Sequence, residues 1–299
     1  MLDPLKFKTQ LQAYVNDVEA YLAKLPWLAE EDMCTCMRYS LMGGGKRIRP
    51  VLALAAAETL GAQPLAILPA AAALELIHTY SLIHDDLPAM DDDDYRRGRL
   101  ANHKMFGEGK AILAGAGLLT YAFELLSEPL PVSADQQLRV IREVAAAAGY
   151  VGMIGGQADD LTAEIKLNEG RDLSLAELEQ IHRRKTGALL LASVRLGAML
   201  GGGTDEQISA LSAYARHLGL AFQIKDDILD LEEDSETLGK PAGSDLRRGK
   251  ATYPALLGLP EAKMYLREQI RQAQAALSGL QGPVAFLADL ADYIEQRHY

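Results

Sequence analysis

The sequence predicts an all-α protein, and three observations lead to that fold class. Apolar residues recur at helical spacing along most of the chain, as in the early stripe Leu11, Val15, Val18 and Leu22. Aromatic residues make up only 6% of the 299 residues, and the apolar share of 49% is mainly alanine and leucine, which favour helices over sheets. No segment shows convincing strand-like alternation. We therefore expect helices joined by turns.

The helices can be justified in order along the chain. After the first stripe, a helix over 49–60 begins near Pro50, a residue suited to a first helical turn. The sequence GAQP separates it from 66–87, and 109–127 follows. Ser133 precedes the start of 134–165, which glycines interrupt, and Ser174 with Glu177 forms a capping box. The remaining helices are expected at 174–200, 204–232, 262–277 and 283–297.

The breaks between these helices are short turn sequences such as SEPLPVSAD, KLNEGRD and SGLQGP. None is long enough, or rich enough in proline and serine, to be an interdomain linker. We therefore expect one domain over residues 1–299.

Charge and cysteine content exclude several classes of protein. The chain has 30 basic and 41 acidic residues, a net charge of −11, which argues against a general nucleic-acid binder. Cys34 and Cys36 are too few for a disulfide framework or a zinc site, and the N-terminus has no signal-peptide pattern. The uncharged stretch 111–123 is too short to span a bilayer. We expect a cytoplasmic protein without a membrane span.

The densest local signal is the sequence HDDLPAMDDDD, which follows an apolar helix. It places six carboxylates in ten positions: Asp85, Asp86, Asp91, Asp92, Asp93 and Asp94. A solvated acidic loop is the ordinary explanation for such a run. Three details argue against it: the preceding apolar helix, the adjacent Arg96 and Arg97, and a second cluster, QIKDDILDLEED, again directly after an apolar stretch.

In the second cluster Asp226 and Asp230 are four residues apart and lie on one face of a helix. Two like charges at that spacing repel, so they need a compensating cation, and oxygen-only ligands suggest Mg²⁺. In the first cluster Asp85 and Asp91 are six apart, with Pro88 preventing a simple helix between them. A local bulge could still direct both carboxylates to one ion.

Magnesium held by a few carboxylates usually binds a phosphate as well, and the chain offers cations for it. The sequence GGGKRIRP supplies Lys46, Arg47 and Arg49 after three glycines, but it lacks the spacing of a nucleotide-binding P-loop. Further basic candidates lie beside glycines or aspartates, namely Arg96, Arg97, Lys185, Lys240 and Lys250.

In this combination the chain resembles the trans-prenyl diphosphate synthases, and in particular their bacterial farnesyl diphosphate synthases. The matching segments are GGGKRIRP, IHTYSLIHDDLPAMDDDDYRRG, HKMFGEGKAILAG, GGQADDL, KTGAL, FQIKDDILD and LGKPAGSD. The order of two aspartate motifs and several basic motifs is highly specific, and it extends from about Leu41 to Leu257. The resemblance implies an isoprenoid-synthase-type helical bundle around a deep central cavity, a single polyprenyl synthase domain and a homodimer.

The resemblance also implies the chemistry. An allylic diphosphate, dimethylallyl or geranyl, loses its diphosphate with the help of Mg²⁺, three ions once diphosphate is bound. The resulting allylic carbocation is attacked by isopentenyl diphosphate. Preorganised cations stabilise the charge of the leaving group, and an apolar cavity excludes water.

Site residues are carried over by matching motif positions. The metal ligands implied are Asp85, Asp86, Asp91, Asp226, Asp227 and Asp230. The isopentenyl diphosphate pocket implied is Lys46, Arg49, His78 and Arg97. The allylic diphosphate contacts implied are Arg96, Lys185 and Lys240, of which Arg96 and Lys185 are also catalytic, together with Thr186 and Gln223, which steady the cation. Gln157 and Asp160 match a segment near the same cavity.

Chain length depends on the residues before the first aspartate. Ser81 lies one helical turn before Asp85, on nearly the same face. Tyr80 occupies the position five before that aspartate. The resemblance to the family implies that an aromatic residue at this position stops chain growth. An ordinary core tyrosine is the alternative explanation. We expect mainly the fifteen-carbon product.

The sequence departs from the family at two places. Ala116 stands where an aspartate is expected, and Leu100 and Ala101 replace the usual residues after RRG. Neither place is a metal motif. Both departures place alanine where a polar residue is usual. We therefore expect positions 101 and 116 to be neighbours in space whose polar pair was lost together.

Three alternatives stay open. A geranyl or geranylgeranyl diphosphate synthase would use the same motifs. A class I terpene cyclase usually has a second motif containing asparagine and serine and lacks the pocket formed by GGGKRIRP and His78. A catalytically silent subunit should have lost metal ligands or cations, which this chain keeps.

Overall fold

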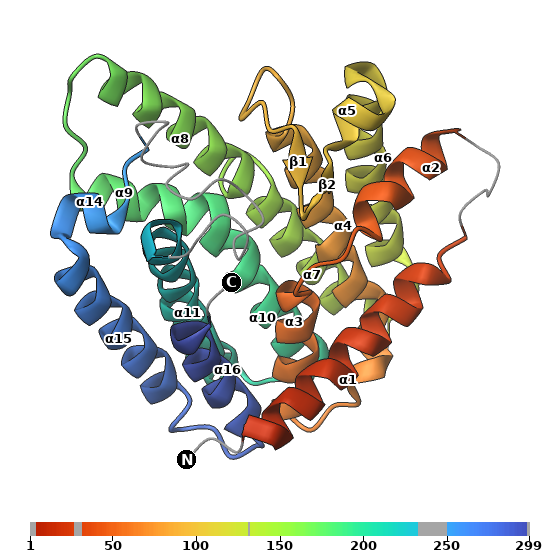
Figure 1. The fold of residues 1–299 in the computed structure, drawn as a ribbon. Coiled ribbons are helices and arrows are strands. Elements are labelled where there is room, and N and C mark those ends of the chain that lie inside the picture. The colour runs from red at the N-terminus through yellow and green to blue at the C-terminus, as the bar shows by residue number, and fades with distance from the viewer. Residues whose placement is uncertain (1–3, 27–31, 131, 233–249, 298–299) are drawn as a thin grey trace.

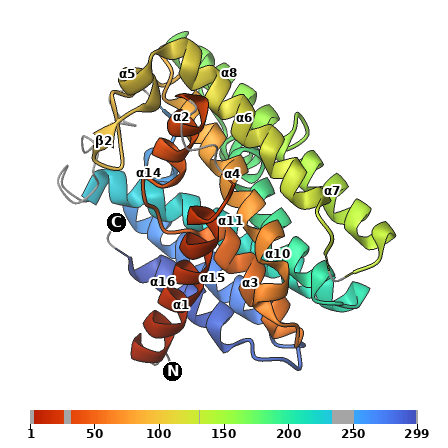
Figure 2. The ribbon, with the colours of Figure 1, turned by 90° about the vertical axis from the view of Figure 1, so that its right-hand side faces the viewer.

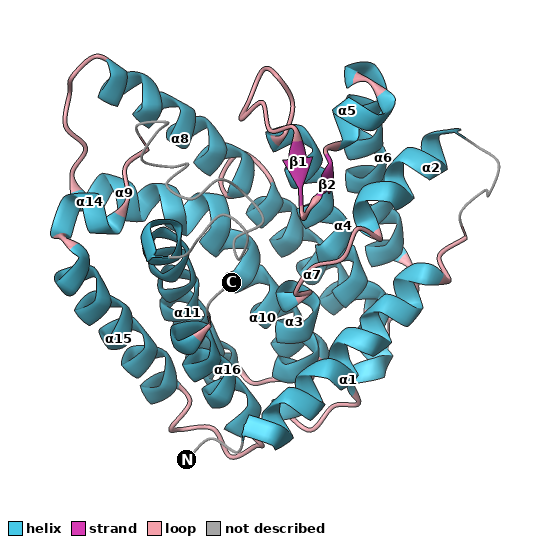
Figure 3. Ribbon diagram, viewed as in Figure 1, coloured by secondary structure: helices cyan, strands magenta, loops and turns pink. Residues whose placement is uncertain are grey.

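A computed structural model describes residues 4–26, 32–130, 132–232 and 250–297. These residues form helices, apart from one hairpin of two short strands (Figures 1 and 3). The first half contains α1 (Pro4–Ala23), α2 (Asp32–Leu41), α3 (Ile48–Thr59), the 3₁₀ turn η1 (Pro64–Ile67), α4 (Leu68–Asp85), β1 (Tyr95–Arg96), β2 (Arg99–Leu100), α5 (Asn102–Phe106), α6 (Glu108–Ser127) and α7 (Ala134–Ala148). The second half contains α8 (Met153–Asn168), α9 (Leu175–His182), the π-helical turn η2 (Arg183–Gly187), α10 (Ala188–Leu200), α11 (Asp205–Glu232), α14 (Tyr253–Leu257), α15 (Leu259–Ala276) and α16 (Ala285–Gln296).

The helices α4, α10 and α11 run through the interior of the molecule, and α3, which is also mostly buried, packs against α4 and α10. α4 packs against α6 and α3, α10 packs against α3, α7 and α11, and α11 packs against α15. One continuous apolar core extends from Phe7 on α1 to Ile294 on α16. The outer helices surround these three, as the two perpendicular views show (Figures 1 and 2). The ends of α4 and α11 carry the two aspartate clusters.

The predicted helices are confirmed in type, and the differences have local causes. The segment 134–165 is two helices, α7 and α8, because the chain turns at Gly149 and Gly152. The segment 174–200 is helical throughout but widens into the π-turn η2. The capping boxes at Ser133 and Ser174 both form.

Sequence periodicity missed four short elements. These are the ten-residue helix α2, the five-residue helices α5 and α14, and the hairpin β1–β2, which pairs Tyr95 with Leu100. Elements of two to five residues are too short for an apolar period to be visible, and the ten-residue α2 buries only Cys36, Met37 and Leu41.

Two helices are long and apolar enough to cross a membrane by length and composition alone: Pro64–Asp85 and Glu108–Ser127. The first is a core helix, with 67% of its apolar window buried inside the protein. The second is only 39% buried, because one face of α6 is turned outward. Core helices of soluble proteins pass the same test, so this is weak evidence for a span.

Candidate active site

The first aspartate motif is built where α4 ends. Asp85 is the last residue of α4, and the loop after it turns back because the Asp91 amide donates to the Asp85 carbonyl over 2.8 Å. Burial raises the pKa of the Asp85 carboxyl to about 6; Lys185 opposes this shift, and Asp91 adds to it. Pro88 lies in this turn, and Asp85 and Asp91 are close enough to interact electrostatically.

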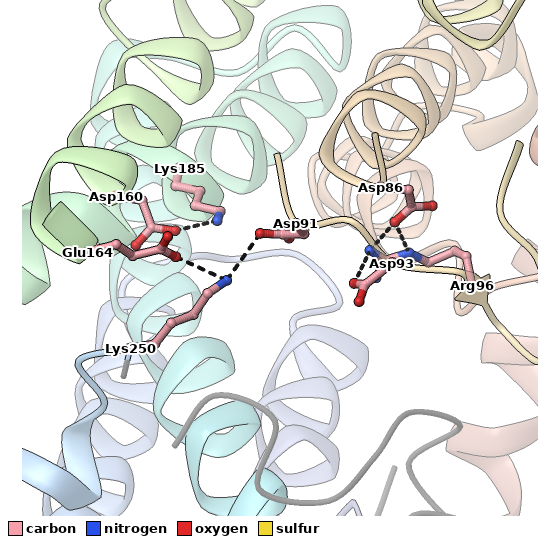
Figure 4. A network of polar contacts seen from close by, with 8 residues as sticks. All are labelled: Asp86, Asp91, Asp93, Arg96, Asp160, Glu164, Lys185 and Lys250. Atoms are coloured by element: carbon pink, nitrogen blue, oxygen red, sulfur yellow. Dashed lines mark hydrogen bonds and ion pairs between the residues drawn. The ribbon is translucent and has the colours of Figure 1, made fainter. Parts of the chain in front are cut away.

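The second residue of the motif, Asp86, is bound by the protein itself. It is 2% exposed, and its carboxylate accepts hydrogen bonds from the Arg96 guanidinium, including one from Nε over 2.8 Å. Arg96 also lies 3.5 Å from Asp93 (Figure 4). Arg96 is thereby fixed between two carboxylates beside the motif.

The second motif lies on the last turns of the continuous helix α11, as its spacing predicted. The Asp226 carboxylate is paired with Arg297 over 2.5 Å. Asp227 and Asp230 are both buried, and Asp227 accepts a hydrogen bond over 2.9 Å from the Tyr253 amide at the start of α14. In both motifs, therefore, the second aspartate has a protein partner.

Two lysines face the first motif from the opposite side (Figure 4). Lys185 on the π-turn donates to Asp160 on α8 over 2.5 Å. Lys250 lies 3.4 Å from Asp91 and 3.6 Å from Glu164. The carboxylates of α8 thus hold two cations next to Asp85 and Asp91.

The π-turn between α9 and α10 sets the position of Lys185 and Thr186. Thr186 donates to the side-chain oxygen of Gln223 on α11. Gly156 on α8 lets this turn approach, because a Cβ there would lie 2.1 Å from the Lys185 backbone nitrogen. Gln157 follows Gly156 on α8. Single π-turns inside helices often occur at functional sites.

Basic side chains gather between the loop before α3 and the end of the hairpin, in a group called the basic pocket below. Arg97 donates to the Gly44 carbonyl, and its guanidinium packs over Gly45, where a Cβ would lie 2.6 Å away. Desolvation lowers the pKa of Lys46 to about 8 and that of Arg49 to about 10, and the neighbouring Arg97 lowers both further.

His78 on α4 belongs to the same pocket. Its pKa lies well below the ordinary value, first because it is desolvated and then because of Arg49, Arg97 and Arg96. His78 is therefore neutral at physiological pH and can offer a ring nitrogen as an acceptor. Asp226 also interacts electrostatically with Lys46 and Arg49, so the pocket faces the second motif.

Arg47 lies between Lys46 and Arg49 in the sequence, but its side chain has a different environment. Its side chain is fully buried and binds Glu19 and Glu75, each over 2.6 Å, and the Leu41 carbonyl over 2.6 Å. Arg47 is therefore a structural residue that fixes the loop between α2 and α3, with φ of 50°.

The two chain-length candidates differ in their surroundings. Tyr80 is 5% exposed, its ring lies edge-on to the His84 ring at 5.6 Å, and its hydroxyl has no hydrogen-bond partner within the described part of the chain. Ser81 bonds to the His78 carbonyl of its own helix over 2.9 Å. Tyr80 is therefore a bulky, buried side chain whose hydroxyl group lacks a hydrogen-bond partner among the described residues.

Other expectations have mixed outcomes. Lys240 lies outside the described residues. Ala101 is buried whereas Ala116 is exposed, so their burial gives no support to a lost buried polar pair. Sequence reasoning missed Arg297 and Glu164. Arg297 is 5% exposed and stacks over the Phe222 ring at 4.2 Å, yet it is 71 residues from Asp226 and has no local signal.

The arrangement suits a hard divalent cation between two basic patches. All the predicted ligands are carboxylates, a donor set that Mg²⁺ prefers. Lysines and arginines lie on both sides, as expected for binding two anionic groups.

Comparison with known proteins identifies the family. The family model "Polyprenyl synthetase" matches residues 30–281. The chain is 49% identical to a farnesyl diphosphate synthase of Geobacillus stearothermophilus, over 97% of this chain and 96% of that one. It is 45% identical to a farnesyl diphosphate synthase of Bacillus subtilis, over 95% and 94%.

A solved structure extends the likeness to the fold. The geranylgeranyl pyrophosphate synthetase of Pyrococcus horikoshii superposes with a TM-score of 0.88 at 31% identity, covering 98% of each chain. The fold prediction is confirmed as the all-α architecture of the prenyl synthases. On these grounds the chain belongs to the polyprenyl synthetase family.

Proposed function

We propose that the protein condenses isopentenyl diphosphate with dimethylallyl or geranyl diphosphate, head to tail, to give mainly farnesyl diphosphate. The observation that carries this proposal is the pairing of Asp85 with Asp91 opposite Lys185, beside a separate pocket of Lys46, Arg49 and Arg97. Two anion sites of this kind suit two diphosphate substrates. The farnesyl diphosphate synthases at 49% and 45% identity favour the fifteen-carbon product.

The metal would be held by carboxylates of both motifs, Asp85 and Asp91 from one and Asp226 and Asp230 from the other. Asp86 and Asp227 support them through Arg96 and the Tyr253 amide. Mg²⁺ held there, as three ions with diphosphate present, would supply positive charge opposite the leaving group.

The side chains of this protein bind the allylic substrate and stabilise the charges that form. Lys185, Arg96 and Lys240 bind the allylic diphosphate and stabilise it as it departs. Thr186 and Gln223, which share a hydrogen bond, direct polar oxygens toward the allylic cation. The buried apolar core around α4 keeps out the water that would quench that cation.

The second substrate, isopentenyl diphosphate, binds at Lys46, Arg49, Arg97 and neutral His78. Desolvation lowers the pKa of the first two cations, and a desolvated cation gains more from an incoming anion than a hydrated one. Holding both substrates in one cavity makes the attack effectively intramolecular.

We assign Tyr80, with Ser81 one residue on, to the end of the tail-binding cavity along α4, because Tyr80 is bulky and buried. The Tyr80 ring blocks a growing chain by steric exclusion. The Tyr80→Ala variant should shift the product toward twenty carbons or more while the first condensation is retained.

The chain is proposed to act as a homodimer of single polyprenyl synthase domains in the cytoplasm, without a membrane span or nucleic-acid partner. The support is the outward face of α6, where Ile112 is 47% and Leu113 58% exposed, beside α7 (Figure 2). Exposed apolar side chains that adjoin one another can form part of a protein interface, whereas single ones are common on any surface.

Product analysis tests the function. Wild type and Tyr80→Ala are each incubated with Mg²⁺, isopentenyl diphosphate and one primer, and the dephosphorylated products are separated by chromatography. We expect farnesol from wild type. Geranylgeraniol from wild type would favour the geranylgeranyl alternative, and no product with any primer would favour the silent subunit.

A further inference from the structure

The acidic run after α4 divides its carboxylates between two directions. Asp91 contacts Lys250 and Asp93 contacts Arg96, so both belong to the active-site network (Figure 4). Asp92 and Asp94 are exposed and instead lie near His103 on α5. One ligand atom from each of Asp92, Asp94 and His103 lies within 4.8 Å of the others. The proposed function uses none of these three side chains.

His103 is the unusual member of this group. It is 6% exposed, and neither of its ring nitrogens has a hydrogen-bond partner within the described part of the chain. A buried ring nitrogen without a partner is unfavourable, and most buried polar groups have one. Two carboxylates within 4.8 Å of such a nitrogen make a metal ion the natural partner.

We propose that Asp92, Asp94 and His103 form a second metal site that binds a divalent transition ion such as Zn²⁺, separate from the magnesium site for the substrates. One imidazole with two carboxylates is a donor set that suits Zn²⁺, whereas Mg²⁺ prefers oxygen alone. Ligands of one zinc ion lie about 3–4 Å apart. The exposed Asp92 and Asp94 side chains can close that gap by rotation.

One contact competes with the ion. Lys104 Nζ lies 2.6 Å from Asp94, in a pair whose side chains are 38% and 60% exposed. An exposed ion pair of this kind contributes little stability, so a divalent ion can displace the lysine. The left-handed backbone at Asp92, with φ of 50°, is tolerated well by aspartate and asparagine.

The position of the site indicates that a bound ion would stabilise the hairpin. Asp92 and Asp94 precede strand β1, and His103 follows strand β2, so an ion would join the two ends of the hairpin. The Ala101 amide already bonds to the Asp94 carbonyl over 2.8 Å at this base. The hairpin carries Arg96, which binds Asp86, and Arg97, which binds the Gly44 carbonyl, and the proposed function assigns both to substrate binding. A bound ion would hold both arginines in place.

The test is Zn²⁺ binding by calorimetry to the chelator-treated full-length protein in excess Mg²⁺, repeated with Co²⁺ to follow histidine ligation by visible absorption. Wild type should bind one ion with a histidine-dependent Co²⁺ spectrum, and Zn²⁺ should raise its melting temperature. The variants Asp92→Asn and His103→Gln should each weaken Zn²⁺ binding at least tenfold. If His103→Gln does not fold, the Zn²⁺ affinity of Asp92→Asn tests the proposal.

Matched controls separate this site from the rest of the chain. Asp93→Asn removes a carboxylate from the same run, and His217→Gln removes a histidine of α11 that bonds to Gln269 of α15. Both should bind Zn²⁺ like wild type. The proposal is overturned if wild type binds no Zn²⁺, or if Asp85→Asn weakens binding as much as Asp92→Asn. Because the readout is binding, it is independent of the product analysis.

Discussion

The two aspartate motifs supply similar carboxylates by different structural means. At the second motif the continuous helix α11 places Asp226 and Asp230 on one face through its own periodicity. At the first motif α4 has ended, and Asp91 is returned to Asp85 by a backbone hydrogen bond of 2.8 Å within a loop. One arrangement depends on local helix geometry, and the other on a turn closed by its own hydrogen bonds.

The motifs also differ in the cations that neutralise them before any metal binds. The first faces Lys185 and Lys250, which α8 carboxylates hold in place. The second faces Arg297 from the C-terminal end of the chain. At the first motif a metal would displace the 3.4 Å contact of Lys250 with Asp91, whereas at the second it would displace the closer 2.5 Å pair of Arg297 with Asp226.

Removing the leading aspartate of either motif should have the largest effect. Asp85→Ala and Asp226→Ala should each lower kcat by about 10²-fold or more, because each carboxylate positions an ion that stabilises leaving-group charge. Steady-state assays with matched circular dichroism spectra measure this. If only one variant loses activity, the two motifs do not both contribute to catalysis.

The second aspartates should matter less for turnover and more for folding. Asp227→Ala leaves the buried Tyr253 amide without its acceptor, which should lower the free energy of unfolding by about 1–3 kcal/mol. Asp86→Ala releases Arg96, which is one-third exposed, so its stability loss should be smaller. Denaturant unfolding compares the two, and Asp227→Asn, which keeps an acceptor oxygen, is the matched control. Equal losses for both alanine variants would contradict the comparison.

Isopentenyl diphosphate binding should depend on pH through Lys46. The pKa of Lys46 is lowered to about 8, so the side chain is charged below that pH and loses its proton as the pH rises through it. The KM for isopentenyl diphosphate should therefore rise roughly tenfold between pH 7 and pH 9. Lys46→Arg keeps the charge and should flatten the profile. A profile that is equally steep in this variant would assign the titration to another group.

The smallest effect is expected at Arg297. The Arg297→Met variant keeps an apolar side chain over Phe222 but frees Asp226, so Mg²⁺ should bind a few times more tightly at the second motif. Mg²⁺ titration of activity, with Arg267→Met as an exposed arginine control, measures the change. Weaker Mg²⁺ binding in Arg297→Met would show that the arginine supports the site rather than competing for it.

Much of the fold could be predicted because the signals for it are local. The helical period of apolar residues located the long helices, and the sequences around Ser133 and Ser174 correctly predicted two capping boxes. The spacing of Asp226 and Asp230 likewise placed them on one helical face. Elements of five residues or fewer, such as α5 and the hairpin, carry too little pattern to be read this way.

Only the tertiary structure decided how neighbours in sequence divide their roles. Lys46, Arg47 and Arg49 look alike in GGGKRIRP, yet Arg47 is buried against Glu19 and Glu75 while the other two enter the basic pocket. The partners that cause this separation are 28 residues away from Arg47 in both cases. The residue types and their order along the chain were enough to identify the family and its chemistry. Which side chain meets which, including Arg297 with Asp226 and His103 with Asp92 and Asp94, depends on contacts between distant segments or across turns, and those contacts leave no periodic trace in the sequence.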